Sequence, residues 1–241
     1  MTEPMTDSLS EFVSRVETDL LPSYCRAKGY PEAGFKRESL GKVTSADARN
    51  CLRAIDEALL ERLPNQRFTM PRNTATEILF WEGSTQKVPR PITLWLEPVI
   101  TFAAIARLHF DFGWPKELLA TQPKSWAFDI SASFADHGDR EHIVGEVKKS
   151  SKEIDVLLRD LNSFCSEPRN EEPPKGDPRR NAFKKWDRLR AIEAPIFWAI
   201  GPGSSDIVFN VDRQSDGRII LREIPVVELR YREPLSSSNS K

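Results

Sequence analysis

The sequence predicts an α/β protein in which a mixed central sheet is flanked by helices. The main observation is an order of helix, strand, strand, helix and strand along residues 91–233. The second is the character of the segments, since the helices are apolar or amphipathic and the strands are short apolar runs bounded by turns. No glycine-rich phosphate loop occurs, which disfavours a nucleotide-hydrolysing fold.

The elements follow from local patterns. An apolar stretch predicts a helix over 92–110, and residues 111–123 are predicted as a turn and a short segment. A polar, glycine-containing turn separates the first two strands. A proline- and charge-rich loop precedes a basic helix near the end of the chain. The predicted strands are 125–134, 142–150, 195–201, 206–211 and 218–224, and the predicted later helices are 151–165 and 182–194.

Residues 1–90 are predicted to form a mainly helical accessory region without chemistry of its own. Helical spacing covers residues 8–27 and 45–63, and the run EILFWEG is a candidate short strand. This region could select a target, mediate homodimerisation or recruit a partner protein, and the sequence leaves these alternatives open. Residues 91–233 form the second predicted domain, and residues 234–241 are predicted as a disordered tail.

Composition limits the classes of partner. The formal net charge of −1 gives no global sign of a polyanion partner, so any nucleic-acid surface must be local. Cys25, Cys51 and Cys165 form no CxxC pair, which argues against a zinc site or a disulfide framework and for a cytoplasmic protein. Glu97 and Pro98 interrupt the longest apolar stretch, so we expect a buried helix and no membrane span.

Three acids fall where the pattern predicts burial. Glu97 lies in the apolar helix, Asp129 stands between Phe128 and Ile130, and Glu146 lies in the second strand. An isolated carboxylate is penalised in such places, whereas several carboxylates that converge on a divalent cation are not. Mg²⁺ prefers oxygen ligands, and such a site can activate water for attack on a phosphate.

Lys148 is two residues after Glu146, so a strand would send both side chains to one face. A neighbouring ammonium can orient the water or neutralise the charge that develops on a phosphate. The alternative is a weak salt bridge on a surface hairpin, where His142 and Lys149 would suit an edge strand. The two consecutive apolar strands, with a helix directly after Lys148, favour the catalytic interpretation.

Asp129 followed by Gly-Glu-Val-Lys resembles the PD-(D/E)xK nuclease signature. More narrowly, the chain resembles the N-terminal nuclease domain of type I restriction enzyme R subunits over about residues 92–165. The resemblance implies a restriction-endonuclease-like core of a helix, a β-meander, a helix and a strand. The matching positions are Glu97, the Gly-Trp-Pro turn at 113–115, Asp129, Glu146 and Lys148.

The resemblance has departures. Phe128 replaces the proline before the aspartate, and Gln122 stands where related domains often carry an acid, which would remove an auxiliary metal contact. No helicase motor follows in this sequence, so we expect a stand-alone nuclease-like protein.

The resemblance also implies a role for each residue. Asp129 and Glu146, with the Val147 carbonyl, would bind Mg²⁺, with Mn²⁺ as a substitute. Lys148 would position the attacking water and stabilise the transition state. Glu97 would hold a second metal or a metal-bound water. The product would be a cleaved phosphodiester in DNA, with RNA as the alternative substrate.

A basic segment offers a local contact for nucleic acid. Residues 175–190 contain seven basic residues against Asp177 and Asp187. These side chains would contact the phosphate backbone, or they equally form a solvated face beside a flexible loop. The candidate contacts are Lys149, Arg179, Arg180, Lys184, Lys185 and Arg188.

Aromatic residues are predicted mainly as core. Phe183, Trp186, Leu189 and Ile192 have the spacing of the buried side of the basic helix. The same prediction is made for Trp81, Trp95 and Trp198.

Two functions from different classes remain. One is a Mg²⁺-dependent endo- or exodeoxyribonuclease, for example in restriction or phage defence. The other is a catalytically inactive, nuclease-derived module that binds nucleic acid or another protein. The intact set of Asp129, Glu146 and Lys148 favours the enzyme, because a decayed site has no need of all three.

Overall fold

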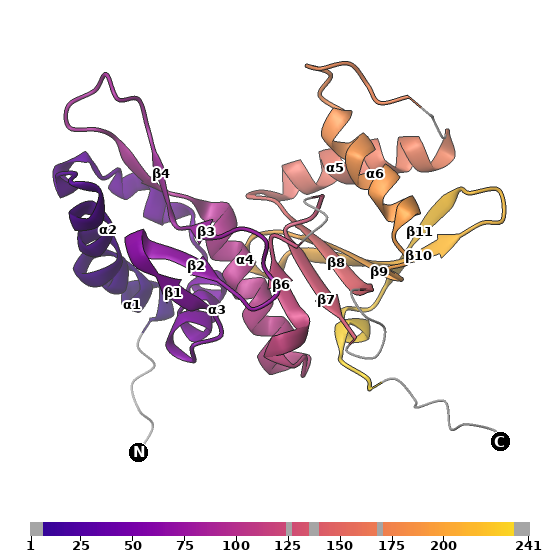
Figure 1. The fold of residues 1–241 in the computed structure, drawn as a ribbon, viewed down its shortest axis with the longest axis horizontal. Helices are drawn as coiled ribbons and strands as arrows, with labels where there is room; N and C mark the ends of the chain where they lie inside the picture. Colours follow the sequence, from indigo (N-terminus) through magenta and orange to yellow (C-terminus); the bar gives the residue numbers. More distant parts are fainter. Residues whose placement is uncertain (1–6, 124–126, 135–139, 168–170, 234–241) are drawn as a thin grey trace.

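A six-stranded mixed sheet forms the centre of the protein. The computed structural model describes residues 7–123, 127–134, 140–167 and 171–233. The strand order is β11-β10-β9-β8-β7-β6, in which β8 and β9 are parallel and the other neighbours are antiparallel (Figure 1). The strands are β6 (Leu119–Thr121), β7 (Ile130–Ser133), β8 (Glu141–Val147), β9 (Ile196–Ile200), β10 (Asp206–Arg213) and β11 (Ile219–Ile224). The predicted α/β class with a mixed sheet is confirmed.

Helices cover both faces of this sheet. Strand β9 shows the division: Trp198 and Ile200 belong to the core cluster that contains α4 (Leu96–Ala106). Phe197 and Ala199 belong to the cluster that contains α5 (Ser151–Ser166) and α6 (Arg180–Ala191). Because successive side chains of a strand point to opposite faces, the sheet lies between two apolar layers. The helices and strands predicted at 151–165, 182–194, 195–201, 206–211 and 218–224 are confirmed to within a few residues.

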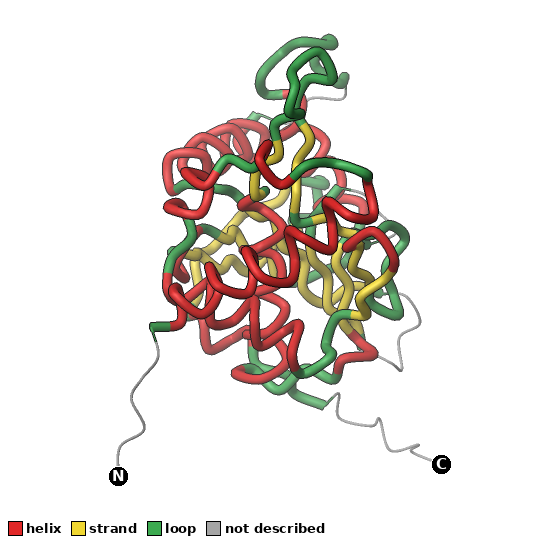
Figure 2. Tube along the Cα trace, turned by 90° about the vertical axis from the view of Figure 1, so that its left-hand side faces the viewer, coloured by secondary structure: helices red, strands yellow, loops and turns green. Residues whose placement is uncertain are grey.

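The first 90 residues form a layer of helices and short strands beside α4 (Figures 1 and 2). This N-terminal layer shares one core cluster with α4 and one face of the central sheet. No helix in the described part of the chain is long and apolar enough to cross a membrane. The elements of the N-terminal layer are α1 (Ser8–Arg15), a π-helical segment (Val16–Leu20), α2 (Leu21–Lys28), α3 (Ser45–Asp56), β1 (Glu61–Leu63), β2 (Arg67–Thr69), β3 (Glu77–Ile78), β4 (Phe80–Glu82) and its partner β5 (Ile92–Leu94).

Some predicted boundaries are wrong. Helix α3 ends at Asp56 instead of residue 63, because the chain turns at Ala58, which has a φ of 51°, and buries two leucines in the turn. The predicted helix at 92–110 begins only at Leu96, since the residues before it pair with β4. Strand β6 lies in the stretch predicted as a turn and a short segment, because three residues are too few to show a strand period. The predicted tail at 234–241 lies outside the described residues.

A buried ion pair joins the end of α4 to the start of β10. Both terminal nitrogens of Arg107 donate to the Asp206 carboxylate at 3.1 Å. The indole N–H of Trp198 donates to the same carboxylate at 2.9 Å. The Asp206 side chain is only 1% exposed, so its charge depends on these donors.

Replacing Asp206 by alanine is therefore expected to lower the free energy of unfolding by about 3–5 kcal/mol, because the Arg107 charge would remain buried without a partner. Urea unfolding followed by circular dichroism measures this difference. The matched control is Glu228→Ala, which removes an exposed ion pair with Arg232 and should leave the midpoint unchanged. Equal midpoints for the two variants would contradict the prediction.

Candidate active site

The structure brings Asp129 and Glu146 together at adjoining strands. The backbone N–H of Asp129 donates to the Gly145 carbonyl at 2.9 Å, and the Val147 N–H donates to the Asp129 carboxylate at 2.8 Å. Asp129 thus contacts the two peptide groups on either side of Glu146, one through its backbone and the other through its side chain. Gly145 allows close packing here, since a Cβ would lie 3.0 Å from Cδ1 of Ile200.

Two lysines hold the carboxylate of Glu146. Lys148 Nζ lies 2.5 Å from Oε1, and Lys185 Nζ lies 2.8 Å from Oε2. The second contact is an ion pair without hydrogen-bond alignment, so Oε2 is buried without an aligned donor. The Glu146 side chain is 4% exposed and lies on the face of β8 that α6 covers. A charge buried to this extent requires such partners.

Helix α5 begins directly after this pair of charges. Ser150 caps the helix, and its hydroxyl oxygen accepts a hydrogen bond from the Glu153 N–H at 3.3 Å. The Lys148 N–H donates to the Ile200 carbonyl of the parallel strand. These contacts at the end of β8 hold the backbone of Lys148 beside β9, while its side chain reaches back to Glu146.

Glu97 lies in the first turn of α4 and is the one residue of that helix that is not fully buried. The indole N–H of Trp95 donates to its carboxylate at 3.0 Å. Glu97 also acts on Lys148 electrostatically. Burial by itself lowers the pKa of Lys148, but Glu146, Asp129 and Glu97 together raise it above its usual value. Lys148 therefore stays protonated among three carboxylates.

The Asp129 carboxyl has a strongly shifted pKa. Burial and the neighbouring Glu146 carboxylate raise it from its usual 3.8 to about 7, against the opposing effects of the Val147 N–H and the two lysines. Two carboxylates that cannot easily both ionise form an environment that a cation would stabilise.

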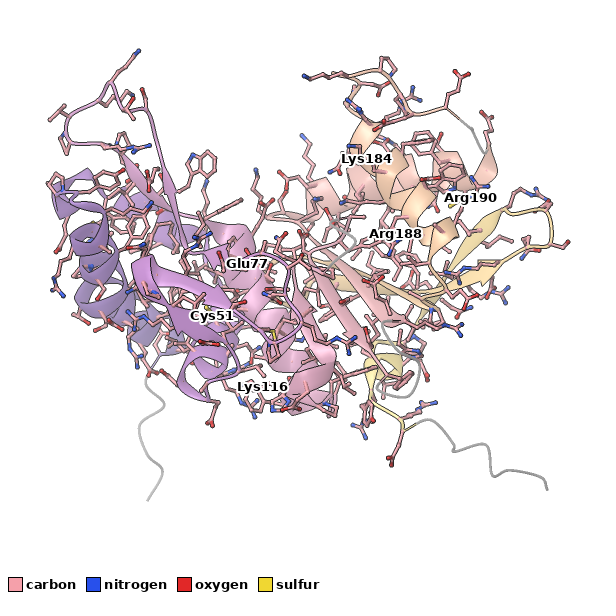
Figure 3. The ribbon with its side chains drawn as sticks, viewed as in Figure 1. Cys51, Glu77, Lys116, Lys184, Arg188 and Arg190 are labelled. Carbon is pink, nitrogen blue, oxygen red and sulfur yellow. The ribbon has the colours of Figure 1, made fainter. Side chains whose placement is uncertain are left out.

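Sequence analysis missed a contribution from the N-terminal layer. Glu77 on β3 is buried, and its carboxylate accepts a hydrogen bond from the Gln122 side chain at 3.0 Å (Figure 3). Burial, together with the nearby Glu97, raises the pKa of Glu77 above its usual value although the Gln122 bond opposes this. An acid therefore does lie beside Gln122, but it comes from a distant part of the chain. No local pattern marks such a contact.

The N-terminal layer also fixes the backbone that leads to Asp129. Thr74 donates to the Gln122 carbonyl through both its N–H and its hydroxyl, at 3.2 and 3.0 Å. Asn73 exchanges two hydrogen bonds with Thr121. Gln122 has a φ of 51°, which is uncommon for a residue other than glycine, and its N–H donates to the Asp129 carbonyl. The first 90 residues thus contact the site directly.

The candidate nucleic-acid contacts divide into two groups. Lys185 is buried in the site, where it also donates to the Ala127 carbonyl at 2.7 Å. The sequence had instead suggested that Lys185 contacts the phosphate backbone of a nucleic acid. The others are at least partly exposed and lie in ion pairs, with Lys184 and Arg188 along α6 (Figure 3). The pairs are Lys149–Glu153, Arg179–Asp177, Arg180–Glu172, Lys184–Glu172 and Arg188–Glu141.

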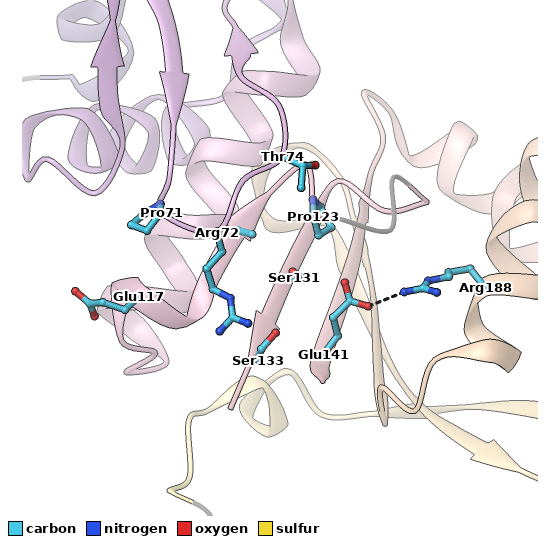
Figure 4. Close-up of a pocket in the computed structure, with 10 residues that line it drawn as sticks. Pro71, Arg72, Thr74, Glu117, Pro123, Ser131, Ser133, Glu141 and Arg188 are labelled. Carbon is cyan, nitrogen blue, oxygen red and sulfur yellow. Dashed lines mark ion pairs between the residues drawn. The ribbon is translucent and has the colours of Figure 1, made fainter. Parts of the chain in front are cut away.

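An open cavity of about 640 Å³ lies beside the site, between residues 71–74 and α6 (Figure 4). Its floor includes Ser131 and Ser133 of β7, and Arg188 reaches it from α6. Neither Asp129 nor Glu146 lines this cavity. His142 is also apart from the carboxylates, since its ring contacts Phe134 and Trp114.

The donor set suits a hard divalent cation. Asp129 and Glu146 offer carboxylate oxygens, and the Val147 carbonyl points to the same side of β8 as its N–H, toward Asp129. The buried Oε2 of Glu146 has no aligned hydrogen-bond donor, which also fits a metal ligand. Within the described residues, however, no three acidic, histidine or cysteine side chains are already arranged as a metal-binding group.

Comparison with protein-family models, with curated proteins and with solved structures found no match. The interpretation of this site therefore rests on the geometry of its own residues.

Replacing Asp129 by asparagine is expected to stabilise the metal-free protein at pH 8 and to have little effect near pH 4. A carboxyl whose pKa is near 7 when folded and 3.8 when unfolded holds its proton more tightly in the folded state. The wild type thus loses stability as the pH rises from about 4 to about 7, by on the order of 2–4 kcal/mol, and the variant does not.

Urea unfolding in EDTA between pH 4 and pH 8 measures this difference. Asp155→Asn, which changes an exposed acid on α5, is the matched control and should follow the wild type. A gain in stability that grows toward low pH would have the wrong sign and would refute the assigned environment of Asp129.

Proposed function

We propose that the protein is a Mg²⁺-dependent nuclease that hydrolyses phosphodiester bonds, most readily in DNA. The observation that carries the proposal is the meeting of Asp129, Glu146 and Lys148 at the ends of β7 and β8. Asp129 and Glu146 are 17 positions apart in the sequence and yet lie in one buried polar cluster. Their spacing in the sequence alone did not require them to be close.

The order of elements around this cluster supports the proposal. Helix α4 is followed by the antiparallel strands β6, β7 and β8, then by helices α5 and α6 and the parallel strand β9. This is the order of helix, β-meander, helix and strand that the resemblance to PD-(D/E)xK nucleases implies. Fold-level likeness does not by itself establish an activity, so the residues must carry the argument.

Each residue has a role that its surroundings support. Bound Mg²⁺ would supply charge neutralisation and water activation, and Asp129, Glu146 and the Val147 carbonyl would hold it. Lys148, which remains protonated, would orient the water and stabilise negative charge on the phosphate. Glu97 would hold a second metal or a metal-bound water from the start of α4. Mn²⁺ would substitute for Mg²⁺ as a ligand of the same oxygen set.

Lys185 would act as a positioning residue. Its ammonium joins Glu146 to the Ala127 carbonyl, two residues before Asp129, and so ties the strand ends that carry both acids. Partners of metal ligands commonly fix the orientation of those ligands in this way.

The second candidate function is an inactive, nuclease-derived binding module. The two ion pairs of Glu146 favour it, because they balance the charge of the carboxylate without a metal. The three free cysteines are typical of a reducing compartment and support a cytoplasmic location for either function.

Glu146→Ala and Lys148→Ala are each expected to lower DNA cleavage at least about 100-fold, because each removes a group that stabilises the transition state. The measurement uses plasmid, linear and single-stranded DNA with Mg²⁺ or Mn²⁺. Lys42→Ala changes an exposed lysine of the N-terminal layer and should retain full activity. If the wild type binds DNA but is as inert as both variants on every substrate, the enzyme proposal fails and the binding module remains.

Neighbouring lysines of α6 provide a matched pair. Lys185→Met is expected to lower kcat roughly 10- to 100-fold and to raise the Mg²⁺ concentration for half-maximal activity, because Glu146 loses one of its two lysine partners. Lys184→Met should leave both values unchanged and only reduce the salt dependence of DNA binding, since its side chain is 59% exposed. Equal kinetic effects of the two changes would contradict the positioning role of Lys185.

A further inference from the structure

Trp81 does not belong to the core, contrary to the prediction from sequence. Its residue surface is 57% exposed, whereas Trp114, Trp186 and Trp198 are fully buried. Trp81 stands on β4, paired with Thr93 of β5, in the hairpin of the N-terminal layer that leads into α4. The exposed indole is therefore open to contact with a ligand.

Trp81 is connected to the candidate active site through Trp95 and Glu97. Its ring packs edge to face against Trp95, with 5.5 Å between the ring centroids. Trp95 in turn donates its indole N–H to the carboxylate of Glu97, which acts electrostatically on Lys148. The half-buried Trp95 therefore supports Trp81 from behind and fixes the ring next to the acid at the start of α4.

Cationic side chains lie near β4 and beside the candidate active site. Glu82, the residue after Trp81, lies between Lys28 at 2.9 Å and Arg90 at 2.8 Å, so two cations surround one carboxylate. Both cations are partly exposed. At the candidate active site, Lys148 and the exposed Lys149 follow Glu146 along the chain. Cations therefore lie near the strand that carries Trp81 and at the site to which Trp95 and Glu97 connect it.

We propose that Trp81, supported by Trp95, is a stacking platform for an unpaired nucleobase of the substrate. An indole face that is fixed beside a phosphate-cleaving site, with cations nearby, has the chemistry that binds single-stranded nucleic acid. A base inside a duplex presents no free face, so the platform selects single-stranded segments or frayed ends. This inference rests on the proposed function, because it assigns the substrate class of the same site.

The test measures binding of the full chain in EDTA, where no cleavage occurs. Fluorescence anisotropy compares a single-stranded oligonucleotide, the same oligonucleotide with one abasic position at varied places, and the matching duplex. Wild type should bind the single strand more tightly than the duplex and should lose affinity when the stacked base is absent. Trp81→Ala should bind the intact single strand about 10-fold or more weakly, and the abasic change should then have no further effect.

Two variants make the comparison specific. Trp81→Phe keeps a smaller aromatic face and should retain most of the affinity. Ile220→Ala removes an exposed apolar side chain of β11, away from β4, and should bind like the wild type. Thermal unfolding of each variant establishes that the fold is intact.

Several outcomes would overturn the platform. One is an unchanged affinity of Trp81→Ala for the single strand. Another is an abasic effect of the same size in wild type and variant. A change of oligomeric state in Trp81→Ala, with unchanged DNA affinity, would assign the ring to a protein interface instead.

The same experiments distinguish a failure of the proposed function from a failure of the stacking platform. If Trp81-dependent binding is present but Mg²⁺ never produces cleavage, the platform stands and the enzyme does not. If cleavage occurs equally on single strands and duplexes in wild type and Trp81→Ala, the enzyme stands and the platform does not.

Discussion

The buried carboxylate of Glu146 is the constraint on which the rest of the candidate site depends. Desolvating this charge without partners would be costly, so Lys148 and Lys185 must both reach it. Lys185 can do so only if α6 packs on this face of β8, whereas Lys148 is two residues after Glu146 on the same face. Lys185, which compensates the buried charge of Glu146, also donates to the Ala127 carbonyl and so helps to fix the geometry around Asp129.

The N-terminal layer contributes to this geometry rather than forming a separate attachment. Its segment around Asn73 and Thr74 hydrogen-bonds to the end of β6, and Glu77 bonds to Gln122, whose backbone holds Asp129. This layer also supplies the exposed ring of Trp81. One physical consequence is that a change in residues 1–90 can alter the site without any contact with a substrate. The predicted division into domains at residue 90 does not separate the site from its support.

Sequence patterns predicted much of the fold but few of the contacts between distant segments. Helix α5 and strands β9 to β11 were predictable because apolar periodicity and apolar runs are local signals. Strand β6, the end of α3 and the start of α4 were not, since each depends on pairing or burial against distant residues. The burial of Trp198 followed from its apolar run, whereas the exposure of Trp81 in a similar run depends on which side of the β4–β5 hairpin faces the core.

The sequence by itself determined the residue types of the site. Asp129, Glu146 and Lys148 could be named from an acid and a Glu-x-Lys pattern on consecutive apolar strands, because strand periodicity places such residues on one face. Only the tertiary structure decided which charges meet. Lys185 became a partner of Glu146 instead of a surface cation, and Glu77 joined the site from the N-terminal layer. Contacts between distant segments are set by packing and by the need to pair buried charges, and no local pattern in the chain encodes either.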